Sequence, residues 1–411
     1  MPNLTPSQTA IIKSTAPLLA THGTTITTLF YSTLLTTHPA LKSVFSNTHQ
    51  ATGAQPRALA GALLAYATHI DDLGALSPTL ALICAKHASL GITPAQYAVV
   101  ATGLLAALED VLTPAVFTAD VKDAWAAAYW QLADIMIAAE AALYASASWQ
   151  GFRAFKIARK EVESAEITSF YLEPVEGERV LPVYKPGQYV SVQVAVPALG
   201  EGVLQARQYS LSDAPGKPYF RISVKRESGY ESAAAAPGKE KLHPGWVSNI
   251  LHAEKGVGDV VGVAHPYGDF FLEVQGEGPV VLISGGVGLT SLMAMLNALV
   301  ERGAGREVTW VHSARNASVR AFGAHVEEVE RAAGNVRVRL FDTHGGRMEL
   351  GELDKEKELF LGDERAEYFV CGPAQFMLDV ETKLKGYGVD AGRIKMELFG
   401  TGGVPRGLSK I

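Results

Sequence analysis

Cysteine is almost absent from this sequence, because only Cys84 and Cys371 occur among its 411 residues. Two cysteines so far apart predict no disulfide framework, which excludes the small, disulfide-stapled class of secreted protein. We therefore expect a reducing compartment, the cytoplasm. A chain longer than roughly 300 residues usually divides its apolar side chains among several cores, so two or three domains are expected.

An excess of positive charge is also lacking. The sequence has 36 Lys and Arg against 42 Asp and Glu, a formal net charge of −6, and no run of basic residues. Nucleic acids are bound chiefly through clusters of Lys and Arg that neutralise phosphates. We therefore expect no nucleic-acid partner, and predict a monomer whose partners are small molecules.

Charge is missing altogether from the stretch Pro279 to Val300, PVVLISGGVGLTSLMAMLNALV. Its length exceeds the roughly 20 residues that cross a bilayer. However, a β-branched run, a glycine cluster and a helix-like segment follow one another within it, which favours a buried strand–turn–helix. The N-terminus has few positive charges and no cleavage-like site, so it predicts a capped helix and not a signal peptide. No integral membrane segment is expected.

Three architectures follow one another along the chain, which makes the expected fold multidomain. Residues 1–148 show helical periodicity with start signals at Thr5-Pro6, Ser77-Pro78, Thr93-Pro94 and Thr118 to Asp120. They predict an all-α domain of five to seven helices, the longest running from about Ala119 to Ser146.

Residues 149–275 carry short alternating runs between prolines and glycines, which predict an antiparallel β-barrel. The expected strands are FKIARKEV, ITSFYLEP, QYVSVQVAV, YFRISVKRE, DVVGVAHP and DFFLEV. From residue 276 to 411, the strand-like runs VVLISG, VTWVHSA, RVRLFD and EYFVCG alternate with helix-like stretches. That alternation predicts an α/β domain with a parallel sheet.

His87 lies in the helical stretch LICAKHASLGI, on one face with Leu80, Ile83 and Leu90. Most histidines on such a face are ordinary core residues. Cys84 and His87 form a C-x-x-H pair, but no further Cys or His completes a pattern for covalent haem attachment or structural zinc. Local sequence therefore leaves both interpretations open, a core histidine or a ligand.

Glu140 suggests a partner for that histidine. It is one of only two charged residues between Ala124 and Trp149, and Met136, Ala139 and Leu143 flank it. A carboxylate on an apolar face needs a partner. Accepting a proton from the far nitrogen of His87 would supply one and would make the imidazole a better electron donor. The alternative is that Glu140 faces solvent at a domain junction.

The β-rich segment contains a candidate flavin-binding constellation. A Gly-Gln-Tyr strand precedes an Arg-Gln-Tyr-Ser strand, whose Arg, Tyr and Ser can meet the pyrophosphate, the ribityl region and a ring nitrogen of FAD. A Gly-Trp-Val-Ser-Asn segment then opens a helix whose free N–H groups can bind phosphate. The candidate residues are Gln188, Tyr189, Arg207, Gln208, Tyr209, Ser210, Gly245, Val247 and Ser248.

The C-terminal segment contains three nucleotide-binding candidates. Glycines in the turn after VVLIS allow backbone to approach a pyrophosphate, although a plain tight turn is the alternative. A Cys-Gly-Pro after EYFV can set a nicotinamide beside the flavin, and a late Glu-x-Phe-Gly can bring a carboxylate and a ring to the flavin edge. The residues are Gly286, Val287, Gly288, Leu289, Thr290, Ser291, Cys371, Gly372, Pro373, Glu397, Leu398, Phe399 and Gly400.

These markers, in this order, resemble the ferredoxin–NADP reductase superfamily. The helical segment, with Phe45, then Gln55, then His87, resembles a globin. Together they resemble a flavohaemoglobin, and the likeness covers essentially the whole chain. Three features depart from that family's pattern. The glycine turn, which often continues with Thr-Pro, reads Gly-Leu-Thr-Ser at Gly288 to Ser291. Leu398 and Thr401 stand where a cysteine is frequent and a proline can follow, and Ser228 to Pro244 resembles an inserted surface loop.

The resemblance implies a role for each matching residue of the helical domain. His87 matches the proximal haem-iron ligand, with Lys86 beside it, and Phe45 matches the ring that wedges the haem. The distal pocket matches Tyr31, Gln55 and Leu59, and the residues that hold the histidine match Tyr97 and Glu140. The implied cofactors are haem b with its iron, FAD and NAD(P)H.

The implied function is a nitric oxide dioxygenase, which converts NO and O₂ to nitrate and so detoxifies NO. Flavin would join a two-electron hydride donor to a one-electron haem. Two alternatives stay open: a carrier or sensor globin for O₂ or NO, and a reductase of lipid hydroperoxides, ferric chelates or quinones. Arg315, after VTWV, lies where a 2′-phosphate would bind, but an exposed Arg is the simpler interpretation, so NADH is favoured over NADPH.

Overall fold

The computed structural model describes residues 4–45, 47–176, 180–229, 245–303, 305–346 and 348–400. The chain forms two compact units. One comprises Met1–Phe152, Gln193–Arg207 and Ser228–Val247, and the other comprises Arg153–Val192, Gln208–Glu227 and Ser248–Ile411. The domain boundaries expected near residues 148 and 276 stay predictions. The predicted loop from residue 230 to 244, and Thr401, lie outside the described residues.

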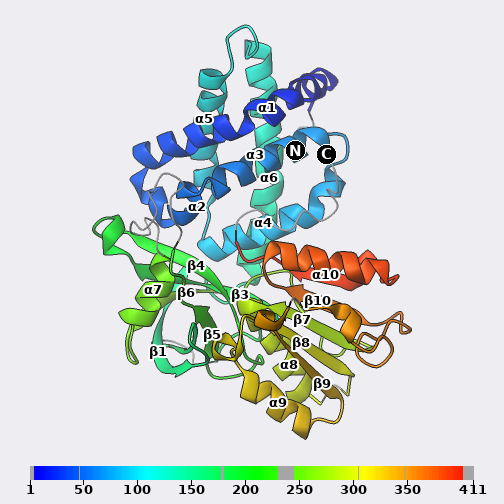
Figure 1. Cartoon of the computed structure of the whole chain (residues 1–411). Coiled ribbons are helices and arrows are strands. Elements are labelled where there is room, and N and C mark those ends of the chain that lie inside the picture. Colours follow the sequence, from blue (N-terminus) through cyan, green and yellow to red (C-terminus); the bar gives the residue numbers. More distant parts are fainter. Residues whose placement is uncertain are drawn as a thin grey trace. The chain divides into compact units, whose positions relative to one another are not determined.

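The N-terminal segment is helical, as predicted, and appears in blue to cyan in Figure 1. The capping Thr5, Thr93 and Thr118 precede helices as expected, whereas Ser77 is the first helical residue and not a cap. The elements are α1 (Pro6–Thr37), η1 (Pro39–Ser43), α2 (Asn47–Ala51), α3 (Ala54–Thr68), η2 (Leu73–Leu76), α4 (Ser77–Leu90), α5 (Pro94–Val111) and α6 (Ala119–Ser146). The described residues of this segment form six α-helices, within the predicted five to seven.

The longest helix is α1 and not α6, which corrects the sequence-based expectation: α1 has 32 residues and α6 has 28. Pro17 lies inside α1, where its missing N–H costs a helical hydrogen bond. Burial outweighs that loss, because Ile12, Leu19, Ile26 and Phe30 are all almost fully buried along one side of the helix. The helix therefore continues through Pro17 to Thr37.

Helices α1 and α3 pack against each other in the core of the helical segment. The Thr27 hydroxyl, fully buried on α1, donates to the Pro56 carbonyl on α3 at 2.8 Å. This bond fixes the two helices in register at the start of α3. It thereby positions Tyr31, one turn further along α1, against Gln55 on α3.

One helical stretch among the described residues, Leu73–Leu90, is long and apolar enough to cross a membrane by length and composition alone. It comprises η2 and α4, and it contains His87.

The middle segment forms a six-stranded sheet in the order β4-β3-β6-β1-β2-β5. Its strands are β1 (Phe152–Val162), β2 (Ile167–Pro174), β3 (Tyr189–Ala195), β4 (Leu204–Ser210), β5 (Phe220–Lys225) and β6 (Val260–Ala264), with η3 (Pro197–Leu199) and α7 (Trp246–Ala253) between them. Strand β2 pairs antiparallel with both β1 and β5. A bridge between Leu211 and Ile222 joins the end of β4 to β5, which closes the sheet as the predicted barrel requires.

The run DFFLEV is not a strand, contrary to expectation. Its alternate residues Phe270, Leu272 and Val274 are buried, which produces a strand-like pattern. They pack into the core of the C-terminal segment, where the Phe270 ring lies edge-on to Phe369. The alternation here reflects burial, and the run forms a single backbone hydrogen bond of the kind seen between strands, from Leu272 N to the Pro186 carbonyl at 3.0 Å, without becoming a strand.

The C-terminal segment forms a five-stranded parallel sheet in the order β11-β10-β7-β8-β9. The strands are β7 (Val280–Gly285), β8 (Val308–Ala314), β9 (Val336–Asp342), β10 (Glu367–Cys371) and β11 (Ile394–Glu397). The helices are η4 (Gly286–Gly288), α8 (Leu289–Glu301), η5 (Ala317–Val319), α9 (Gly323–Ala332), η6 (Thr343–Gly345), η7 (Leu350–Glu352), α10 (Ala374–Gly386) and η8 (Ala391–Arg393). The strand–turn–helix predicted for Pro279 to Val300 is confirmed, whereas β11 was not foreseen.

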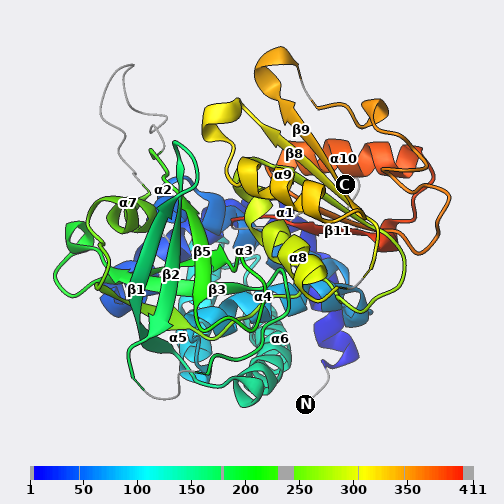
Figure 2. The ribbon, with the colours of Figure 1, turned by 90° about the horizontal axis from the view of Figure 1, so that it is seen from below.

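Helices α8 and α9 cover one face of this sheet and α10 covers the other (Figure 2). The chain reverses direction across the sheet at β7, because β8 lies on one side of it and β10 on the other. In open α/β sheets, ligands bind beyond the carboxyl ends of the strands at such a switch point. The sheet therefore directs attention to the turns after β7 and β10.

A buried polar network joins the barrel strands to the parallel-sheet segment within the second unit. Asp213, which follows β4, accepts from Asn297 on α8 at 2.9 Å and from Tyr219 at 3.0 Å. The Asn297 amide oxygen contacts His325 Nε2 on α9 at 2.8 Å. The Asn297 side chain thus bridges Asp213 and His325, and its removal leaves both of these polar groups without that partner.

We expect Asn297→Ala to lower the free energy of unfolding of this unit by about 1–3 kcal/mol, the usual cost of leaving buried polar groups without a partner. Urea unfolding followed by flavin fluorescence measures the change. Gln375→Ala is the matched control, because the Gln375 amide bonds only an exposed carboxylate, Asp379, on α10. Equal effects of the two substitutions would contradict the role of the network.

Candidate functional site

His87 lies in the last turn of α4, which ends at Gly91 in the left-handed conformation (φ 72°). One face of α4 is buried, as shown by Cys84 and Ala88. The face that carries His87 is only half-buried, together with its apolar neighbours Leu80, Ile83 and Leu90. The His87 side chain itself is 32% exposed. This face therefore has room for an apolar group that the protein side chains do not fill.

Glu140 is buried and holds the far side of the imidazole. The residue is 2% exposed on α6, so the alternative that it faces solvent is wrong. Its Oε1 lies 2.8 Å from His87 Nδ1 and accepts the Tyr97 hydroxyl at 2.5 Å. The Tyr97 oxygen is 3.0 Å from His87 Nδ1. Three residues from α4, α5 and α6 thus meet at one carboxylate oxygen.

This arrangement determines which imidazole nitrogen carries the proton. An ionised carboxylate only accepts hydrogen bonds, so the Nδ1 atom beside Glu140 must be the donor. In a neutral imidazole the lone pair is then on Nε2. A histidine held in this tautomer by a carboxylate is the usual form of a metal-binding imidazole, because the partner fixes the ring and raises its basicity.

Tyr97 is itself fixed, and two of the residues involved were missed from the sequence. The Tyr129 hydroxyl donates to the Tyr97 carbonyl at 2.7 Å, and the Tyr144 hydroxyl donates to the Ile92 carbonyl at 2.6 Å. Burial and the bond to Glu140 raise the pKa of Tyr97, so its hydroxyl stays protonated and donates. The sequence feature that could have revealed them is the pair of tyrosines on the side of α6 that faces α5. Helical periodicity alone did not distinguish these tyrosines from ordinary core aromatics.

A second group of predicted residues meets between α1 and α3. The Gln55 amide donates to the Tyr31 oxygen at 3.3 Å. Burial raises the pKa of Tyr31 to about 12, although the Gln55 bond opposes the rise. The phenol is therefore protonated at neutral pH, and its proton remains available because Gln55 occupies the oxygen as a donor. The Phe45 ring lies edge-on to Tyr31 at 5.3 Å, and Leu59 packs in the same core.

These observations fit haem. The donor set is one imidazole on a half-buried apolar face, which suits an apolar disc with a single protein ligand to its iron. Lys86 is half-buried next to His87, as the sequence order requires. Cys84 is buried in the adjoining cluster with Tyr97 and Met136, as a small apolar neighbour.

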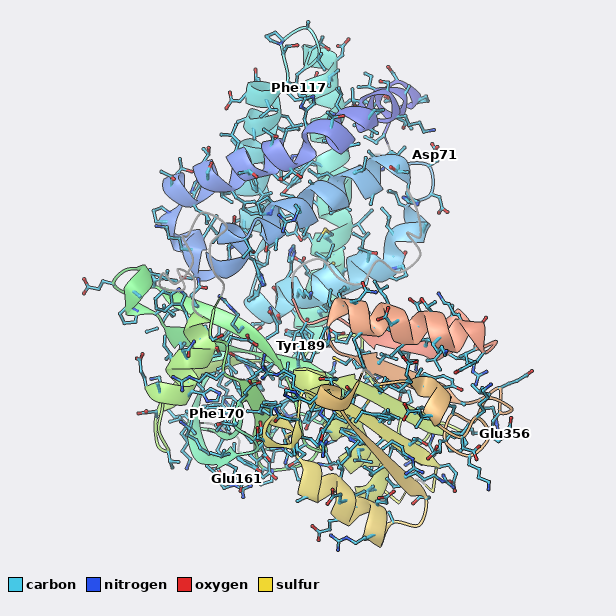
Figure 3. The ribbon with its side chains drawn as sticks, viewed as in Figure 1. Asp71, Phe117, Glu161, Phe170, Tyr189 and Glu356 are labelled. Atoms are coloured by element: carbon cyan, nitrogen blue, oxygen red, sulfur yellow. The ribbon has the colours of Figure 1, made fainter. Side chains whose placement is uncertain are left out.

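The predicted flavin residues gather on two neighbouring strands and a helix start. Arg207, Gln208, Tyr209 and Ser210 end β4, which lies beside β3 in the sheet. Tyr189 begins β3 and Gln188 immediately precedes it (Tyr189 is labelled in Figure 3).

Each of these segments has its own local anchors. The Tyr189 N–H and carbonyl exchange hydrogen bonds with Tyr267, each at 2.9 Å. Gly245 precedes α7, Val247 is buried in it, and the Ser248 hydroxyl accepts from Glu227 N at 3.2 Å. The first two motifs therefore fall on adjacent strands of the barrel segment, and the third falls at the start of α7.

The predicted nucleotide-binding motifs follow β7 and β10, and their backbones lie in direct contact at the switch point between these two strands. Strands β7 and β10 pair in parallel, with Ser284 opposite Cys371. A Cβ atom added at Gly288 would lie 2.7 Å from the Gly372 nitrogen and closer still to the Cys371 carbonyl. Only glycine allows this approach. Gly286 and Val287 complete the short turn η4, and Leu289, Thr290 and Ser291 begin α8.

Glu397 extends the same row across the sheet, because β11 pairs with β10 so that Glu397 lies opposite Cys371. Both are buried, and burial together with Glu397 raises the pKa of the Cys371 thiol, against a bond to Ser291. The thiol is therefore neutral. The other predicted residues flank this row: Gly372 and Pro373 connect β10 to α10, and Leu398, Phe399 and Gly400 follow β11.

Two buried nitrogens near this edge have no hydrogen-bond partner among the described residues, His312 Nε2 on β8 and Arg320 Nε after η5. Burial and the Arg320 charge lower the pKa of His312 to about 4, so its ring is neutral. The polar groups of a bound nucleotide are suitable partners for both nitrogens. Arg315 is exposed, as expected, and it also forms an ion pair with Glu166.

Comparison with known proteins adds independent findings. The globin family matches residues 28–136, and the oxidoreductase NAD-binding domain family matches residues 282–382. The flavohemoprotein of Bordetella parapertussis is 46% identical over 98% of this chain and all of its own length.

Two solved structures are also similar. The flavohemoglobin of Malassezia yamatoensis, solved with bound FAD and heme, has a TM-score of 0.82 at 27% identity and covers 97% of this chain and 100% of its own. The FAD/NAD-binding domain of the Vibrio cholerae nitric oxide dioxygenase has a TM-score of 0.51 at 35% identity, over 60% of this chain and 98% of its own. The architecture of helical globin, antiparallel FAD domain and parallel-sheet NAD domain is thereby confirmed.

We expect Glu140→Gln to weaken haem binding by about 10- to 100-fold, the usual effect of removing a partner that orients a metal-binding histidine. The amide keeps an acceptor for Nδ1 but loses the charge, so the iron–histidine stretching band in the Raman spectrum should move to lower frequency. Haem transfer to an acceptor apoglobin measures the affinity. Asp134→Asn, on the same helix, is the control, and an identical spectrum for the two variants would contradict the assignment.

We expect Gly288→Ala to destabilise the protein by about 1–3 kcal/mol, because the added carbon must displace the Cys371 backbone. The KM for reduced nucleotide should rise with it. Thermal unfolding and steady-state ferricyanide reduction measure the two effects. Gly334→Ala is the matched control, since no atom lies within 4 Å of the added carbon. Unchanged KM in Gly288→Ala would remove this turn from the nucleotide site.

Proposed function

This chain belongs to the flavohaemoprotein family, and from that premise we propose that it is an NAD(P)H-dependent nitric oxide dioxygenase. In the proposed reaction, two NO and two O₂ are converted to two nitrate ions while NAD(P)H is oxidised to NAD(P)⁺ with release of a proton. The coarser activity, an oxidoreductase with an NAD-binding domain, follows from the family itself. The related Vibrio cholerae protein is named a nitric oxide dioxygenase.

The observation that carries the proposal is the buried His87–Glu140–Tyr97 cluster. When bound, haem supplies an iron atom at which O₂ and NO react, and FAD supplies a carrier that accepts hydride and releases electrons singly. Glu140 holds the Nδ1 proton of His87 and so makes Nε2 a strong electron donor. Strong donation on the proximal side favours O–O cleavage, which a dioxygenase requires and a simple carrier does not.

The residues of the distal pocket support the same chemistry. Tyr31 keeps its proton up to high pH and offers it to a small oxygen-containing ligand. Gln55 orients the Tyr31 oxygen, so the hydroxyl proton need not be shared with it. Phe45 and Leu59 surround this donor with apolar side chains, which strengthens its hydrogen bond.

The electrons come from NAD(P)H in this proposal, and the flavin and nucleotide residues would hold the two groups that carry them. We assign Arg207 to Ser210, with Gln188 and Tyr189, to FAD, and the turns after β7 and β10 to NAD(P)H. The protein would work in the cytoplasm as a monomer, with O₂, NO and NAD(P)H as its small-molecule partners. Two buried free cysteines, Cys84 and Cys371, are compatible with a reducing compartment.

The decisive experiment follows NO consumption by the purified holoprotein with an NO electrode, with and without O₂, and quantifies nitrate. We expect NADH-dependent NO loss that requires O₂ and yields one nitrate per NO. A carrier or sensor would consume NO without continued nucleotide oxidation. A reductase of other acceptors would oxidise nucleotide without forming nitrate. NO loss that needs no O₂ would refute the dioxygenase proposal.

Two variants link that activity to the site. His87→Ala should lose the haem Soret band and NO consumption while it keeps flavin absorbance. Tyr31→Phe should keep haem but release O₂ about tenfold faster, the factor that loss of one good hydrogen bond represents. An unchanged rate of O₂ release would exclude Tyr31 as the donor.

A further inference from the structure

Strand β8 ends at Ala314, next to the switch point between β7 and β10. In sheets with this strand order, the pyrophosphate lies at the glycine turn after the first strand and the adenosine ribose beyond the end of the next. There an acidic group favours the 2′-hydroxyl of NADH, and a free arginine favours the 2′-phosphate of NADPH. The residue that follows β8 is Arg315.

Arg315 is not a free arginine, because its guanidinium pairs with the Glu166 carboxylate. Glu166 comes from the turn between β1 and β2 of the barrel segment, far from β8 in sequence.

The backbone on both sides of this pair is anchored. The Ala165 N–H donates to the Ser318 carbonyl at 2.9 Å, and the Arg226 N–H donates to the Glu166 carbonyl at 2.8 Å. The Arg315 carbonyl accepts from His344 N at 3.3 Å. The carboxylate is therefore presented to the end of β8 by fixed backbone.

The second arginine at this edge is also paired with a carboxylate. Arg320, which follows η5, contacts Asp342 at the end of β9. Among the described residues, Arg315 and Arg320 are thus each paired with a carboxylate. A 2′-phosphate that reached Arg315 would have to displace Glu166 or remain beside its charge.

We propose that Glu166 is a specificity-determining residue that selects NADH against NADPH. It acts in two ways: it occupies the cation that would bind a 2′-phosphate, and it repels that phosphate directly. The Arg315 and Glu166 side chains are 63% and 31% exposed. Exposed ion pairs stabilise little, so repulsion of the phosphate is the larger effect. The proposal rests on the proposed function only in that NAD(P)H reduces the bound flavin.

The test is anaerobic stopped-flow reduction of the FAD-loaded full chain, with NADH and NADPH as the two donors. Wild type should be reduced faster by NADH at equal, sub-saturating concentration. Glu166→Gln should raise the second-order rate constant for NADPH about three- to tenfold, the effect of removing one nearby like charge in solvent. The rate constant for NADH should stay within about twofold, because its ribose carries no 2′-charge.

Two further variants make the result specific. Glu173→Gln removes the same charge from the same barrel segment, where Glu173 pairs with Lys156 at 3.2 Å, and should leave the nucleotide preference unchanged. Arg315→Ala added to Glu166→Gln should remove only the smaller part of the gain for NADPH, the part that the released cation contributes, because the relief of repulsion by Glu166 remains.

The inference would be overturned if the ratio of the rate constants for flavin reduction by NADPH and by NADH were the same in Glu166→Gln as in wild type. It would also be overturned if the wild type were reduced faster by NADPH. The readout involves neither NO nor O₂. If the protein lacked dioxygenase activity, this ratio of rate constants could still be measured. If the ratio did not change as expected, the result would say nothing against NO consumption. A flavin that neither nucleotide reduces would overturn this inference together with the reductase part of the proposed function.

Discussion

The hydrogen bond between the buried Glu140 carboxylate and His87 Nδ1 is the interaction on which the helical site depends. A carboxylate that is 2% exposed must be satisfied, and here the imidazole and the Tyr97 hydroxyl both meet its Oε1. The same hydrogen bond therefore provides the buried carboxylate with a partner and fixes the tautomer of the histidine. The three residues come from three helices, so the packing of α4, α5 and α6 is built around a polar group and not only around apolar contact.

The nucleotide site depends on a different constraint, the close approach of two backbones. Gly288 packs directly against the backbone of Cys371 and Gly372. The turn after β7 and the turn after β10 therefore fix each other's position. Parallel pairing places Ser284, Cys371 and Glu397 in one row at this edge. Backbone packing and sheet register thus position the residues of the nucleotide site, whereas a hydrogen bond positions His87.

Sequence reasoning succeeded where a pattern has a local cause. Capping threonines such as Thr5 and Thr93 precede real helices, and strands bounded by glycine and proline were found nearly to the residue. It failed where burial and local pattern diverge. DFFLEV alternates because it packs on another segment, not because it pairs, and α1 continues past Pro17 because its buried face outweighs one lost hydrogen bond. Strand β11 is too short, at four residues, to show a period of its own.

The sequence by itself determined the order of the three architectures and most candidate residues, because periodicity, turn residues and motif order are properties of the chain. Only the tertiary structure decided which candidates meet. It decided that Glu140 is buried against His87, as one of the two sequence interpretations expected, and it showed that Arg315 is paired with Glu166. Neither contact follows from spacing, because each partner comes from an element whose position is set by packing. Long-range partners of a charge are properties of the folded chain alone, since burial and register are what bring them within bonding distance.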